Sequence, residues 1–286
     1  MSYEEREAKI SFYSKEEITC PLCETIFHRE ELRSGLGRLI AGGLTDELHR
    51  LYEPSARYGE VFPLLYQATV CPGCWYAAMG KDFAEIPDYA KTTGINDRKK
   101  RIADTQLIFP DADFSRPRDL ISGAASLYLV TRCCTYFPSE FSPTIKQGVA
   151  SLRAGWLFEE LHKKFPGEHY DWLMQLFKKK AQYLYNEAIR RETKGKETLS
   201  GLKIFGPDTD KDYGYEGALY LSVLLLYKYG YLDNPKLRTN CLDEAKRTIA
   251  KIFGIGKSSR AKPGPLLENA RNLYDNINKE LNTADV

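Results

Sequence analysis

Two close pairs of cysteines are the residues of this chain best suited to chemistry. They stand in the motifs Cys20-Pro21-Leu22-Cys23 and Cys71-Pro72-Gly73-Cys74. A C-x-x-C turn presents two thiolates side by side, and a structural zinc ion is bound by four such soft ligands in a tetrahedron. Proline after the first cysteine favours the turn. The two motifs therefore predict one structural zinc ion per chain, held by Cys20, Cys23, Cys71 and Cys74.

Other uses of the four cysteines stay open at this point. An iron centre of rubredoxin type would use the same thiolates, and a C-x-x-C motif can also act as a redox dithiol. The 47 residues between the motifs exceed the roughly 15–20 of compact zinc sites, but the cost of closing a loop grows only logarithmically with its length. His28 could replace one thiolate, although its position favours an ordinary histidine on a strand surface. Four cysteine ligands leave no open coordination position, so catalysis at the metal is not expected.

The residues around the cysteines predict short strands. β-prone runs lead into Cys20 and Cys71, so the pattern of strand, cysteine turn and strand occurs twice. Residues 34–62, between the two copies, are rich in glycine and predict an insertion with one short helix at 44–51. We therefore expect residues 1–93 to form a small zinc-ribbon-like β module with a long insertion.

From residue 94 onward, apolar residues recur every three or four positions, which predicts helices. Ala181, Tyr185 and Ala188 also match the spacing of small and large residues in the second helix of a tetratricopeptide repeat. Consecutive helices joined by short turns predict stacked antiparallel hairpins. The expected fold is mainly α: the zinc-ribbon module is followed, over residues 94–286, by a tetratricopeptide-like α-solenoid fragment. The predicted helices cover 120–134, 149–165, 172–189, 212–229, 236–252 and 265–281.

Composition and charge exclude several classes of protein. The 286 residues are 43% hydrophobic and 28% charged, as in soluble globular proteins, which excludes a disordered chain or a fibre. The net charge of +2 produces no overall field toward nucleic acid, and the basic run 98–101 is expected to be a solvated face. The most apolar run, 217–227, is much shorter than the ~20 residues that span a membrane. A polar N-terminus and paired, reduced cysteines favour a cytoplasmic protein without a membrane span.

Several segments resemble an uncharacterised bacterial family, a domain of unknown function. Its members combine two CPxC knuckles with a tetratricopeptide-like helical tail. The resemblance implies a zinc-bound, tetratricopeptide-like protein of bacterial origin, and no settled biochemical activity comes with it. Beyond the knuckles it is carried by Arg33-Ser34-Gly35, Trp75-Tyr76-Ala77-Ala78, Asp113-Phe114-Ser115 and Leu152-Arg153-Ala154-Gly155-Trp156-Leu157.

The expected function is that of a non-enzymatic adaptor or scaffold, because helical repeats bind other proteins on their concave face. No histidine, acid and nucleophile arrangement predicts catalysis, so an enzyme is not expected. The tyrosines of one segment are candidates for partner contacts, with core packing as the alternative. A nucleic-acid-binding zinc ribbon is the second hypothesis and an iron-containing redox protein the third, while self-association is left open. The candidate partner-binding residues are Tyr213, Tyr215, Tyr220 and Tyr227.

Overall fold

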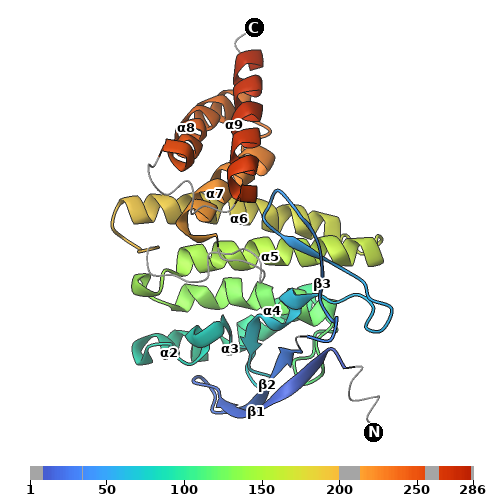
Figure 1. Cartoon of the computed structure of the whole chain (residues 1–286). Coiled ribbons are helices and arrows are strands. Elements are labelled where there is room, and N and C mark those ends of the chain that lie inside the picture. The colour runs from blue at the N-terminus through green and yellow to red at the C-terminus, as the bar shows by residue number, and fades with distance from the viewer. Residues whose placement is uncertain (1–8, 34, 200–212, 255–263, 285–286) are drawn as a thin grey trace.

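A computed structural model describes residues 9–33, 35–199, 213–254 and 264–284. The fold is mainly α, as expected: small β hairpins near the N-terminus precede eight α-helices in this part of the chain (Figure 1). The strands are β1 (Ser11–Thr19), β2 (Ile26–Leu32), β3 (Ile40–Leu44), β4 (Arg50–Glu53), β5 (Ala68–Val70) and β6 (Ala77–Met79). The helices are α2 (Asp88–Asn96), α3 (Arg98–Ile108), α4 (Leu120–Cys133), α5 (Pro143–Lys164), α6 (Tyr170–Thr193), α7 (Gly214–Tyr229), α8 (Pro235–Gly254) and α9 (Gly264–Ala284).

Each cysteine motif forms the tip of an antiparallel hairpin. In the first, β1 pairs with β2 up to Thr19 and Ile26, which flank the turn that begins at Cys20. In the second, β5 pairs with β6, and Val70 opposite Ala77 flanks the turn that begins at Cys71. The predicted order of strand, cysteine turn and strand is confirmed in both copies.

The insertion between these hairpins holds a third hairpin, and the helix expected at 44–51 is wrong. Strand β3 pairs with β4, with Leu44 opposite Arg50. The turn between them is closed by Leu48, whose amide donates to the Thr45 carbonyl at 3.0 Å. Leu48 has a φ of 60°, a left-handed conformation that a helix cannot contain. Its side chain is fully buried, so tertiary packing outweighs the local helical spacing.

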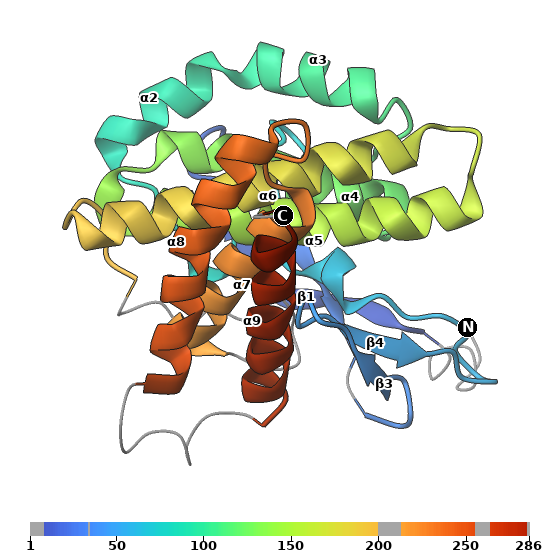
Figure 2. The same cartoon turned by 90° about the horizontal axis from the view of Figure 1, so that it is seen from above.

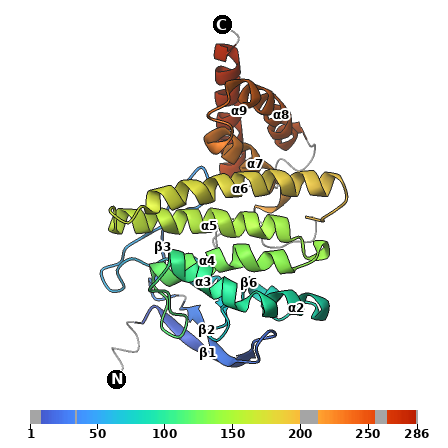
Figure 3. The ribbon, with the colours of Figure 1, turned by 180° about the vertical axis from the view of Figure 1, so that it is seen from behind.

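The helices form a layered stack that starts at the hairpins and ends at the C-terminal pair (Figures 1 and 3). Helices α4, α5 and α6 run back and forth beside one another, and α7 packs on α6. Helices α8 and α9 form a pair that stands across the end of the stack, as seen from above in Figure 2. The six predicted helices are confirmed, but α5 begins at Pro143 rather than at residue 149, and the predicted start at residue 212 lies outside the described residues. Helices α2 and α3 were not predicted: only Ala90 and Gly94 are buried along α2, and only Arg101 and Thr105 along α3.

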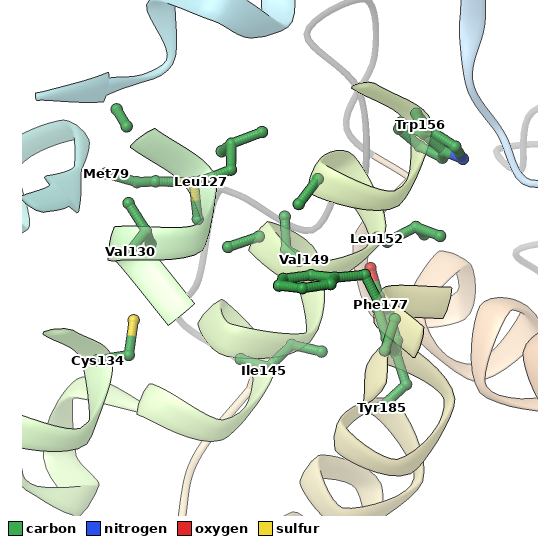
Figure 4. Packing of buried hydrophobic residues seen from close by; sticks show 14 of the residues in the cluster. Met79, Leu127, Val130, Cys134, Ile145, Val149, Leu152, Trp156, Phe177 and Tyr185 are labelled. Atoms are coloured by element: carbon green, nitrogen blue, oxygen red, sulfur yellow. The ribbon is translucent and has the colours of Figure 1, made fainter. Parts of the chain in front are cut away.

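One apolar core joins the hairpins to the stack. Met79 of β6 lies against Leu127 and Val130 of α4 in Figure 4, and the same cluster continues to Phe177 of α6. This core crosses the expected boundary between residues 1–93 and 94–286. That the two parts fold independently therefore stays a prediction. No helix in the described ranges combines the length and apolar character that a membrane crossing requires.

Candidate metal centre

The two knuckles bring Cys20, Cys23, Cys71 and Cys74 together. Their four Sγ atoms lie within 4.8 Å of one another. The Cys20 and Cys74 Sγ atoms are 3.6 Å apart, and the Cys23 and Cys71 Sγ atoms are 3.5 Å apart. These distances are much longer than the ~2.05 Å of a disulfide bond. They are close to the roughly 3.8 Å between sulfurs that a Zn–S bond of ~2.3 Å gives in a tetrahedron. The cluster can hold a metal ion such as zinc.

The two turns have the same backbone conformation, which presents each pair of thiols in the same way. In each turn, the amide of the residue after the second cysteine donates a hydrogen bond to the carbonyl of the first cysteine. The amide of the first cysteine donates to the carbonyl of the next residue along the chain after that. The residues after the second cysteine, Glu24 and Trp75, have φ values of 60° and 59°. The hydrogen bonds are Glu24 N to Cys20 O at 3.0 Å, Cys20 N to Thr25 O at 2.9 Å, Trp75 N to Cys71 O at 2.9 Å and Cys71 N to Tyr76 O at 2.9 Å.

Gly73 and Thr25 are in direct contact where the two knuckles meet. A Cβ atom on Gly73 would lie 2.4 Å from the Thr25 Oγ1 atom. The same hydroxyl lies 3.2 Å from the Cys23 Sγ atom, within hydrogen-bond distance of sulfur. Only glycine at position 73 therefore lets the second knuckle approach the first closely.

The cluster lies mostly inside the protein. Cys20, Cys71 and Cys74 are buried, and Cys23 is half-buried. Hydrogen bonding to the Cys20 and Cys71 sulfurs, followed by burial, raises the pKa of the Cys74 thiol far above its usual range. Hydrogen bonds from the Cys20 and Cys74 sulfurs lower the pKa of Cys71. Four ionised thiols this close together repel one another, so ionisation of all four needs a cation among them. His28 lies exposed on β2, outside the cluster.

A buried arginine supports the second knuckle, and the sequence analysis did not identify it. The Arg101 Nε and Nη2 atoms donate to the Cys74 carbonyl at 3.1 and 2.7 Å. Its Nη1 atom donates to the Gly94 carbonyl at 2.8 Å and to the Tyr136 hydroxyl at 3.1 Å. Arg101 is 0% exposed, whereas the run 98–101 was expected to be a solvated face. The acceptors come from three distant segments, so no local pattern reveals them.

The four candidate partner tyrosines do not form one exposed patch. Tyr213 and Tyr220 are buried, and the Tyr220 hydroxyl donates to the Asp46 carbonyl at 2.7 Å. Tyr227 is half-buried, and Tyr215 is 37% exposed. Tyr213 and Tyr220 therefore pack in the core, which was the alternative to partner contacts for these tyrosines.

Comparison with known proteins gives relatives across nearly the whole chain. Residues 13–277 match a family described as "Uncharacterized protein conserved in bacteria (DUF2225)". An "Uncharacterized protein" from Borreliella burgdorferi is 40% identical over 273 residues, which cover 96% of this chain and 98% of that relative. No solved structure matches the chain. The matches and the paired cysteine knuckles agree with the resemblance found in the sequence, and the chain belongs to the DUF2225 family of bacterial proteins.

Proposed function

We propose that this chain is a non-enzymatic, protein-binding adaptor or scaffold in which one structural zinc ion holds the N-terminal hairpins together. The observation that carries the zinc proposal is the convergence of four Sγ atoms within 4.8 Å. Zinc would accept Cys20, Cys23, Cys71 and Cys74 as its four ligands, with no position left for a substrate. We therefore assign the metal a structural role, in a fold of zinc-ribbon type.

The reduced thiols also suit a cytoplasmic protein, because the cytosol keeps cysteines reduced. Iron bound by the same four thiolates is the competing assignment, and it would support a redox role. A visible absorption spectrum of freshly purified protein separates the two, because zinc has no d–d transitions in this range. A colourless protein with one equivalent of zinc supports the proposal, and a coloured protein that contains iron contradicts it.

For the helical part, we propose a tetratricopeptide-like α-solenoid fragment that binds a segment of another protein. The supporting observation is a groove of about 430 Å³ between α6, α7 and α8. The Asn186 Nδ2 atom donates to the Ser222 carbonyl at 3.2 Å and so joins α6 to α7 in the groove. Tyr183 and Tyr231, which are 64% and 44% exposed, line the groove. Such half-exposed aromatic side chains are suited to anchor a bound segment.

The groove proposal can be tested with a charge placed at its edge. Tyr183→Asp should abolish cross-linking to a partner protein, because the carboxylate would disrupt the apolar contact. Tyr89→Asp is the control, since Tyr89 is 68% exposed and lies on α2, away from the groove. In-cell cross-linking should recover a defined partner with the wild type and with Tyr89→Asp but not with Tyr183→Asp. Recovery of the same proteins with all three chains would contradict the proposal.

One observation favours nucleic-acid binding as a second candidate function. The Arg98 Nη2 atom donates to the Gly73 carbonyl at 2.7 Å, which fixes the start of α3 beside the second knuckle. Lys99 and Lys100 follow Arg98 on α3 and are exposed, so two cations come directly after the arginine that contacts the second knuckle. Binding of a single-stranded oligonucleotide that weakens steeply with salt, and is lost in Lys99→Glu/Lys100→Glu, would support this function. Absence of such binding at low salt would leave the adaptor function.

A further inference from the structure

Helices α2 and α3 are in contact with both knuckles. On the first knuckle, Leu22 packs so closely against α2 that a Cβ on Gly94 would lie 2.7 Å from its Cδ1 atom. On the second knuckle, Arg101 of α3 binds the Cys74 carbonyl through two nitrogens. Figure 2 shows α2 and α3 as consecutive helices along one outer side of the stack. The helix pair therefore docks on residues of both knuckles.

Among the residues that the structure describes, no carboxylate lies within hydrogen-bond distance of the Arg101 side chain. Its hydrogen-bond acceptors there are two backbone carbonyls and the Tyr136 hydroxyl, all neutral. The nearest carboxylate, Asp97, is 4.0 Å from the Nη1 atom. Arg132 already binds both oxygens of Asp97, at 2.9 and 2.8 Å. Asp97 is therefore a shared counter-charge for Arg101, linked to it also through the Tyr136 hydroxyl, which donates to Asp97. A fully buried guanidinium gains from a further negative charge nearby.

The candidate metal centre can supply that further negative charge. Four thiolates around one divalent ion leave a net charge of about −2, and Arg101 bonds to the carbonyl of the ligand residue Cys74. We infer that Arg101 is the counter-ion of the tetrathiolate centre, so that metal binding and the docking of α2 and α3 onto the knuckles stabilise each other. This inference rests on the proposed zinc centre. In this inference Arg101 is a positioning residue, and the bound metal stabilises the docking of α2 and α3.

Loss of the metal would affect both contacts that hold α2 and α3 on the knuckles. Without the metal, the Cys20–Cys23 and Cys71–Cys74 turns lose their common link, and the contacts of Gly94 and Arg101 no longer lie on one rigid surface. Loss of this common surface weakens the docking of α2 and α3, whereas α5 and α6 pack chiefly on each other.

Metal affinity of Arg101 variants tests the inference. Arg101→Met keeps much of the side-chain volume but removes the charge, and Arg101→Lys keeps the charge but not the planar fork. Lys100→Met is the matched control, because Lys100 lies on the same helix and is exposed. Competition with a chromophoric chelator should show that Arg101→Met binds zinc about 10–100-fold more weakly. We expect Arg101→Lys to fall in between and Lys100→Met to equal the wild type.

Hydrogen exchange on the wild-type chain is a second measurement, which does not depend on whether Arg101→Met folds. Removal of zinc should accelerate exchange of the α2 and α3 amides about tenfold or more, with little change in α5 and α6. Equal zinc affinity of folded Arg101→Met and wild type, or equal α2 and α3 exchange with and without zinc, would overturn the inference. A wild type that binds no zinc would instead overturn the proposed centre itself.

Discussion

At the scale of single residues, the contact between Gly73 and Thr25 determines how closely the knuckles approach. Gly73→Ala should destabilise the zinc-loaded protein by about 1–3 kcal/mol, because its Cβ would overlap the Thr25 hydroxyl. The double variant Gly73→Ala/Thr25→Ala should recover part of this loss, since only the Thr25 Cβ, at 3.3 Å, would remain close. Urea unfolding measures both changes.

Gly167→Ala provides the control for this prediction, because no atom lies within 4 Å of the position of its Cβ. That variant should unfold within about 0.5 kcal/mol of the wild type. If Gly73→Ala were equally neutral, or if Thr25→Ala failed to relieve it, the close contact between the knuckles would be contradicted.

Glu47 is a second residue with an unusual setting, in the turn between β3 and β4. Its side chain is 5% exposed, and it accepts hydrogen bonds from Trp156 Nε1 at 2.6 Å and from the Tyr229 hydroxyl at 2.7 Å. The Lys228 and Lys178 Nζ atoms lie 3.3 and 3.7 Å from its oxygens. Burial by itself would raise the pKa of Glu47, but the two lysines and the two hydrogen bonds outweigh burial and lower it.

The lowered pKa of Glu47 makes its contribution to stability dependent on pH. This contribution is present above the pKa of about 4.3 of the unfolded chain and is lost as pH falls through the lower folded value. Glu47→Gln should therefore cost about 1–3 kcal/mol at pH 7, because it removes the buried carboxylate that Lys178 and Lys228 share. The two lysines then keep Glu159, at 3.0 Å from Lys178, and Asp46, at 2.7 Å from Lys228. Urea unfolding at pH 7 and near pH 3 should show the difference from wild type shrinking in acid.

The control for Glu47 is Asp243→Asn, which removes an exposed acid that pairs with Arg247 one helical turn away. We expect it to change stability by less than about 1 kcal/mol at either pH. A loss in Glu47→Gln that stayed constant between the two pH values would contradict the role of its charge.

At the scale of elements, segments with strong local patterns were predictable from the sequence. The cysteine turns and the helices with a clear apolar stripe were found because each pattern lies within one element. The segment 44–51 was mispredicted since Leu44, Leu48 and Leu51 have helical spacing, while Leu48 is pulled into the core in a left-handed conformation. Burial of Arg101 depends on acceptors in the second cysteine turn, in α2 and in the segment after α4, which no local pattern can indicate.

Helix α4 offers a prediction at this scale, because a reciprocal cap fixes its start. The Ser122 amide donates to the Asp119 Oδ1 atom at 2.7 Å, and the Asp119 amide donates to the Ser122 Oγ atom at 2.9 Å. Asp119→Ala should cost about 1 kcal/mol in thermal or urea unfolding. Asp111→Ala, in the exposed loop before α4, is the control and should be nearly neutral. An equal loss in both variants would contradict the cap.

At the scale of the whole molecule, the insertion between the knuckles contacts helices from the middle of the stack. The turn of the β3–β4 hairpin reaches α5 through Trp156, α6 through Lys178 and α7 through Tyr220 and Tyr229. The same chain segment thus links the candidate metal centre to helices more than 100 residues further on. A structural metal at the knuckles would fix both ends of this insertion.

Metal content is the measurement that tests the central claim most directly. Elemental analysis should be done on protein purified without added metal, on Cys71→Ser and on the control Cys241→Ser, whose cysteine lies on α8 outside the cluster. We expect about one zinc per chain in the wild type and in Cys241→Ser, and a large loss in Cys71→Ser. Zinc retained in full by Cys71→Ser, or a wild type without zinc, would contradict a structural zinc centre at these four cysteines.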